Sequence, residues 1–126
     1  MLSLPLPVRI FLCTQPADMR RSFDGLAQMV REFLDADPLT GHLFVFRNKK
    51  GDRIKLLYWD TDGLAIWYKR LEEGHYRFPP VPETGHGVEI RAADLTMLLD
   101  GVDLGSVKRQ RRYRRPDALP EPAKSA

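Results

Sequence analysis

Six of the cations between Val45 and Gly74 are the side chains of this sequence whose type and spacing best suit a chemical task. In VFRNKKGDRIKLLYWDTDGLAIWYKRLEEG they are Arg47, Lys49, Lys50, Arg53, Lys55 and Lys69. Lysine and arginine gathered on one surface bind phosphate oxygens, which holds a nucleic acid without reading its bases. Two tryptophans, Trp59 and Trp67, interleave with them and could stack on bases or contact a protein. The pattern predicts a nucleic-acid interface, and the alternative is an ordinary solvated sheet face.

The C-terminal segment is a second candidate for phosphate contact. Residues 108–126 hold seven Lys/Arg and two Asp/Glu, a net charge of +5, whereas residues 1–107 hold thirteen and fifteen, a net charge of −2. A basic block of this kind attracts polyanions, although a solubilising, disordered tail is the alternative. The expected phosphate-binding residues of this tail are Lys108, Arg109, Arg111, Arg112, Arg114 and Arg115.

Catalytic and metal chemistry find little support in the sequence. Asp60-Thr61-Asp62-Gly63 resembles the opening of a calcium-binding loop, but Leu71 stands where the glutamate of that loop should fall. The three histidines have no ligand spacing, and one cysteine excludes both a disulfide framework and a four-cysteine metal site. Walker and G-x-S-x-G motifs are missing from the sequence. We interpret the protein as non-enzymatic, without catalytic residues, metal or cofactor.

The elements that must position these residues form one α+β domain over residues 1–107, followed by the tail. Hydrophobic periodicity and turn residues predict strands at 8–13, 43–48, 53–59, 64–71 and 88–91, and helices at 22–34 and 92–99. We expect an antiparallel β-meander of three to five strands, packed against one main helix and a short C-terminal helix. The apolar start is interrupted by Pro5 and Pro7, so a signal peptide is not expected, and no stretch is long enough to span a bilayer. The expected location is the cytoplasm.

Alternation of side chains along the meander predicts how its strands pair. The even positions are mostly apolar, and if they share one core face, both hairpins need loops of odd length. Three-residue loops at 49–51 and 61–63, each ending in glycine, satisfy this requirement. The expected pairs on the opposite face are Arg47 with Arg53, Lys55 with Lys69, and Leu57 with Trp67. A two-residue turn at Asp62-Gly63 is the competing choice, and it would set Lys55 against Tyr68.

Several motifs resemble one known family. They include Asp18-Met19-Arg20, Asp24-Gly25-Leu26, His42-Leu43-Phe44-Val45-Phe46, Gly51-Asp52-Arg53, Trp59-Asp60 and Tyr68-Lys69-Arg70-Leu71-Glu72. Together they resemble the small TnpB-type accessory proteins encoded by bacterial insertion sequences of the sixty-six family, over roughly residues 8–104. This resemblance implies a role in transposition beside a separate, larger transposase. It does not extend to the RNA-guided nuclease of the same name, because this chain is far too short and lacks its zinc cysteines.

The residues and the resemblance together leave two main hypotheses. In the first, the protein is an accessory factor that binds DNA through the sheet cations and the tail. In the second, it is an adaptor that contacts the transposase through Leu57, Trp59 and Trp67, since aromatic residues dominate interface energetics. A homo-oligomer that buries the same face is a third option. Asp18-Met19-Arg20 fits either a functional role or a structural ion pair with a core anchor, and the sequence does not decide between them.

Overall fold

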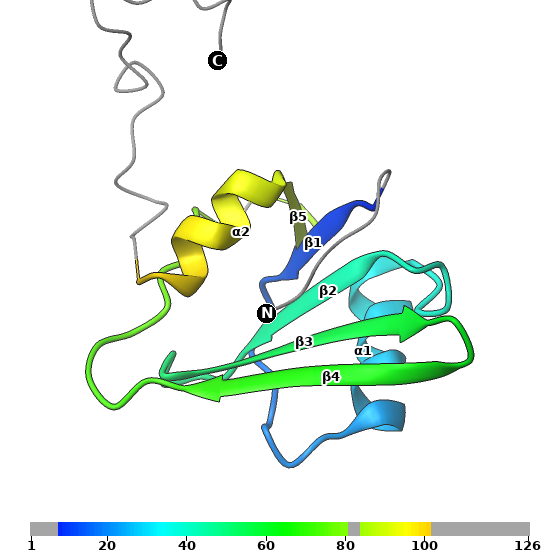
Figure 1. Ribbon diagram of the computed structural model, residues 1–126, viewed down its shortest axis with the longest axis horizontal. Helices are drawn as coiled ribbons and strands as arrows, with labels where there is room; N and C mark the ends of the chain where they lie inside the picture. The colour runs from blue at the N-terminus through cyan, green and yellow to red at the C-terminus, as the bar shows by residue number, and fades with distance from the viewer. Residues whose placement is uncertain (1–7, 81–83, 102–126) are drawn as a thin grey trace, which may run out of the picture.

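The protein folds into a five-stranded sheet with one helix packed on each face (Figure 1). The computed structural model describes residues 8–80 and 84–101. The elements are β1 (Ile10–Cys13), α1 (Phe23–Leu34), β2 (Leu43–Arg47), β3 (Arg53–Asp60), β4 (Gly63–Arg70), β5 (Gly87–Ile90) and α2 (Ala92–Leu99). The strand order across the sheet is β4-β3-β2-β1-β5. The α+β class is therefore confirmed.

The sheet is mixed, so the prediction of a wholly antiparallel sheet is wrong. β1 runs parallel to β2, with Ile10 beside Leu43 and Leu12 beside Val45. Parallel neighbours need a crossover connection, and α1 provides it between these two strands. The remaining pairs, β2 with β3, β3 with β4 and β1 with β5, are antiparallel.

Two separate hydrophobic clusters cover the two faces of the sheet. On one face, Phe44 and Phe46 pack with Leu26 and Val30 of α1. On the other face, the alternate residues of the same strands pack with α2. This second cluster includes Leu43, Val45, Leu56, Leu95 and Leu98. A strand buried on both sides reads as a continuous apolar run rather than an alternation. The odd and even positions of β2 therefore both belong to the core.

The strand register differs from the predicted one by one residue in each hairpin. β2 pairs Arg47 with Ile54, and β3 pairs Lys55 with Tyr68. The predicted pairs of Arg47 with Arg53 and Lys55 with Lys69 are therefore wrong. The competing two-residue turn is right in length and in setting Lys55 against Tyr68, but its residues are Thr61 and Asp62, because Asp60 pairs with Gly63.

The helices begin and end close to their predicted bounds. α1 starts directly after Ser22, although the Ser22 side chain makes no capping hydrogen bond. α2 spans Ala92–Leu99 as predicted, and Gly101 follows it with a φ of +87°. In the described ranges no helix is long and apolar enough to cross a bilayer. The predicted boundary at residue 107 and the basic tail lie outside the described residues.

Gly51, in the turn between β2 and β3, and Gly63, the first residue of β4, should respond oppositely to substitution by alanine. Gly51 has a φ of +86°, which an L side chain adopts at a cost of about 1–2 kcal/mol. Gly63 has no positive φ, and no atom lies within 4 Å of the place that an alanine methyl group would take, so alanine there should be neutral or stabilising by about 0.5–1 kcal/mol. Urea unfolding of Gly51→Ala and Gly63→Ala measures both changes. Equal losses in the two variants would contradict the observed second turn.

Candidate nucleic-acid interface

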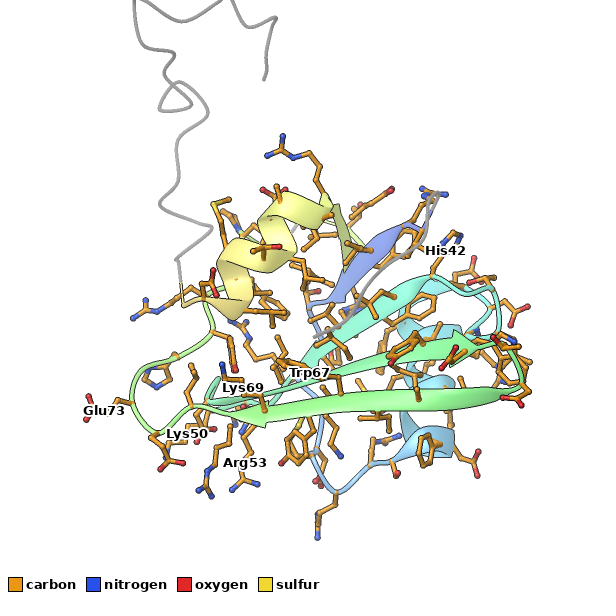
Figure 2. The ribbon with its side chains drawn as sticks, viewed as in Figure 1. His42, Lys50, Arg53, Trp67, Lys69 and Glu73 are labelled. Carbon is orange, nitrogen blue, oxygen red and sulfur yellow. The ribbon has the colours of Figure 1, made fainter. Side chains whose placement is uncertain are left out.

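A basic groove lies between the loop that precedes α1 and the turn that joins β2 to β3. Its volume is about 570 Å³. The residues that line it are Pro16, Ala17, Asp18, Met19, Arg20, Asn48, Lys49, Lys50 and Arg53. Figure 2 shows Lys50 and Arg53 at the end of the sheet where β3 begins and β4 ends. Four of the nine lining residues are cationic and one is acidic, so the groove suits an anionic ligand.

One wall of this groove is organised by an ion pair between Asp18 and Arg20. The Arg20 Nη2 atom lies 2.6 Å from Asp18 Oδ2, and the Arg20 backbone N–H donates to Asp18 Oδ1 at 2.9 Å. The hydrogen bonds from Arg20 lower the pKa of the Asp18 carboxyl to about 2. Met19, between them, packs against the α1-side core. The motif therefore forms the ion pair and core anchor that were one of its two interpretations.

Lys55 of β3 connects this loop to the sheet by hydrogen bonds. Its side chain is buried on the α1 face of β3, and its Nζ donates to the carbonyl oxygens of Met19 at 2.8 Å and Arg21 at 2.9 Å. The same Nζ lies 4.6 Å from the centroid of the Tyr68 ring. A buried ammonium needs such partners because it has lost its hydration. The predicted phosphate ligand Lys55 is thus engaged inside the protein.

Arg47 is also engaged inside the protein, on the opposite face of the sheet. Its Nη1 donates to the carbonyl oxygen of Tyr76 at 2.9 Å, and its guanidinium lies 4.1 Å from the centroid of the Phe78 ring. Burial lowers the pKa of this arginine. Arg47 therefore positions the chain that follows β4 and does not line the groove.

The turn between β2 and β3 presents its lysines from an ordered backbone. The Asn48 Oδ1 accepts from the N–H groups of Gly51 at 2.9 Å and Arg53 at 3.1 Å, while its Nδ2 donates to Asp52 Oδ1 at 2.8 Å. This bond from Asn48 is the main cause that lowers the pKa of Asp52. Lys49 and Lys50 are exposed, and only Lys50 approaches a carboxylate, 3.9 Å from Asp52, among the residues that the structure describes.

Beside the groove, two arginines face each other across β3 and β4. Arg53 pairs directly with Arg70, and Arg53 Nη1 donates to the Tyr68 hydroxyl at 3.3 Å. Arg70 also lies 3.1 Å from Glu72. Like charges opposite each other in a sheet are destabilising unless an anion compensates them. Sequence reasoning missed Arg70, and a two-residue turn in the second hairpin would have placed it beside Arg53.

The remaining sequence-predicted residues do not meet on one surface. Lys69 shares the α2 face with Ile54, so it lies on the other side of the sheet from Arg53. Leu57 is buried under α1. Trp59 lies on the α1 face and Trp67 on the α2 face, both partly exposed, so the predicted aromatic patch is divided between two faces. The six tail cations lie outside the described residues.

Metal binding has no support in the part of the chain that the structure describes. Residues 8–80 and 84–101 contain no group of three or more His, Cys, Asp or Glu side chains that could hold a metal ion.

The fold and the groove define a small α+β domain with a basic surface. The chain belongs to the family of IS66 Orf2-like proteins, whose model matches residues 8–109. This family assignment suggests an accessory role in transposition of IS66 elements.

Two relatives from Sinorhizobium fredii (strain NBRC 101917 / NGR234) are similar to the chain. The uncharacterized protein y4jC is 40% identical over 103 residues, which cover 82% of this chain and 86% of that protein. The uncharacterized protein y4hO is 38% identical over 96 residues, which cover 76% and 82%. No solved structure matches the chain significantly.

Removing the Lys55 ammonium should destabilise the protein and loosen the groove. The variant Lys55→Met keeps most of the buried stem but loses two hydrogen bonds from a charged donor, so we expect a loss of about 2–3 kcal/mol in the free energy of unfolding. Urea unfolding measures this loss. The control Lys69→Met, at an exposed position on the other face, should change stability by less than about 0.5 kcal/mol. Equal effects would contradict the structural role of Lys55.

The Asp18 carboxyl should titrate near pH 2 in the wild-type protein, because hydrogen bonds from Arg20 favour its charged form. In Arg20→Gln, the midpoint should rise toward the ordinary value of 3.8. Any contribution of this pair to stability is present above the ordinary pKa and is lost as the pH falls through the folded value. An NMR titration of the carboxyl carbon measures the midpoint. An unchanged midpoint in Arg20→Gln would contradict the ion pair.

Proposed function

We propose that this protein is a transposition accessory factor that binds the phosphate backbone of DNA in its basic groove. The observation that carries the proposal is the composition of the groove, in which Arg20, Lys49, Lys50 and Arg53 accompany a single acidic residue, Asp18. Phosphate contacts supply most of the affinity of proteins that bind DNA without sequence preference.

The distribution of charge within the groove supports this interpretation. Asp18 is already paired with Arg20, so it does not neutralise the turn lysines. Over the described ranges no carboxylate lies within ion-pair distance of Lys49 or Arg53. These two cations, with Lys50 between them in the sequence, are the best placed to meet phosphate oxygens. The basic tail, which is predicted to bind phosphates, would add further contacts to the DNA backbone.

The proposed contacts concern the backbone of the nucleic acid, so they carry little sequence information. The groove by itself should therefore bind terminal-repeat DNA and random duplex DNA about equally. The adaptor hypothesis predicts a different result: the protein would bind the transposase and would not bind DNA directly.

Salt dependence of DNA binding tests the proposal in the full-length chain. Each phosphate contact contributes about −0.9 to the slope of log affinity against log salt. The double variant Lys49→Gln/Arg53→Gln should therefore reduce the magnitude of the slope by about 1.8. Fluorescence titrations on terminal-repeat and random duplexes between low and physiological salt measure this slope.

The matched control is Arg31→Gln/Arg77→Gln, which removes the same charge from exposed residues that do not line the groove. Its slope should stay within about 0.5 of the wild-type value, since it loses no specific phosphate contact. An equal change in both double variants would reduce the effect to net charge. Absence of DNA binding by the wild-type chain at low salt, with capture of the transposase intact, would support the adaptor instead.

A further inference from the structure

β4 forms an outer edge of the sheet, and its free side is long and regular. The strand has eight residues and pairs with β3 on one side, while the strand order places no described strand on its other side. Its pairing with β3 is continuous from Arg53–Arg70 to Asp60–Gly63, without a bulge, and it contains no proline. Such an edge invites another strand, and natural proteins normally blunt or cover it.

The turn determines which backbone groups point outward from this edge. Asp60 and Gly63 close a two-residue turn, so Gly63 directs its N–H and C=O groups toward β3. The direction alternates along the strand. Leu64, Ile66, Tyr68 and Arg70 therefore present their N–H and C=O groups to the outside.

We propose that a second copy of this chain pairs with β4 in antiparallel orientation, with Ile66 opposite the second copy's Ile66. The two sheets would join edge to edge about a two-fold axis perpendicular to the sheet, which is the commonest symmetry of protein dimers. Such an axis keeps each residue on its own face, so opposite residues have the same parity. The central pair Ile66–Ile66 satisfies this condition and also uses the outward-facing backbone groups.

Charge complementarity selects this register. Pairing at Ile66 brings Asp62, in the turn directly before β4, to the end of the strand pair next to the second copy's Arg70, and the symmetry repeats this contact at the other end. A shift of two residues, with Trp67 opposite itself, would set Asp62 against the second copy's Glu72, and Leu64 against its Arg70. Opposite charges across a strand pair are stabilising and like charges destabilising, so the first register is favoured.

Side-chain size agrees with the same register. Ala65 would lie opposite the second copy's Trp67 on the α2 face, where the small side chain leaves room for the indole. Leu64 would lie opposite the second copy's Tyr68 on the α1 face. Tyr68 is 46% exposed in the single chain, so this contact would cover one of its large exposed side chains.

A charge swap tests the pairing in the full-length protein. Sedimentation equilibrium should show a species of twice the chain mass for the wild-type protein. Arg70→Asp alone and Asp62→Arg alone should each weaken the dimer about tenfold or more, because each creates two like-charged pairs. The double variant Asp62→Arg/Arg70→Asp should restore association to within a few-fold of wild type. A wild-type chain that stays monomeric at all concentrations, or a double variant as weak as the single ones, would overturn the proposal.

Hydrogen exchange tests the location of the interface independently of the charges. In the dimer, the amides of Leu64, Ile66 and Tyr68 should exchange at least tenfold more slowly than in dilute, monomeric protein. The amides of Ala65 and Trp67, which bond to β3, should be protected at both concentrations and serve as the control. If the dimer forms but the outward-facing amides stay unprotected, the interface lies elsewhere. If these amides are already protected in the monomer, another segment of the chain covers the edge. Either result would overturn the proposal.

Discussion

The basic groove depends on the two hydrogen bonds that the buried Lys55 ammonium donates to the loop before α1. Lys55 lies in β3 between the buried residues Ile54 and Leu56, and its Nζ donates to two carbonyl oxygens of the loop before α1. Because the charge is buried, losing these oxygens would leave it with the Tyr68 ring but without a hydrogen-bond acceptor, which is costly for a buried ammonium. These hydrogen bonds therefore hold the loop over the sheet. As a consequence, the Asp18–Arg20 pair of this loop forms one wall of the groove. One buried cation therefore positions the surface that carries the other cations.

The same division of roles explains why counting cations overstates the interface. Arg47 and Lys55 each lie on an inward-facing side of the sheet, satisfied by backbone carbonyls and an aromatic ring. Lys49 and Lys50 lie in the turn beyond the pairs of β2 with β3, Arg53 lies at the end of β3, and all three line the groove. Long basic side chains can bury their stems while their charged ends find specific acceptors, so polarity alone does not place them at the surface. The structure separates cations that hold the fold from cations that remain open to a ligand.

Much of the element plan could be predicted from the sequence, whereas the register could not. α1 and α2 have periodic apolar faces and clear ends, and all five predicted strands lie within about two residues of their observed bounds. The predicted strand pairing is wrong because β2 is buried on both faces, so the alternation used to choose loop lengths is not informative there. The parallel pairing of β1 with β2 was not predicted for a related reason. Local turn signals identify hairpins, but they do not identify two strands that are connected through a helix. The groove depends on both the register of the hairpins and the parallel pairing of β1 with β2, because it joins residues near position 20 with residues near position 50.

The backbone of the turn between β2 and β3 is also attached to the chain beyond β4. The Asp52 carbonyl accepts from the N–H of Leu71 at 2.8 Å, and the Gly51 carbonyl accepts from the N–H of Tyr76 at 2.7 Å. Ordering a residue's backbone costs about 1–2 kcal/mol of conformational entropy, and here folding meets that cost before any ligand arrives. Lys49 and Lys50 have only side-chain rotamers left to fix on contact. In the proposed complex with DNA, the adjustment on contact would therefore be confined to the side-chain bonds of each lysine, and the turn backbone would keep its conformation.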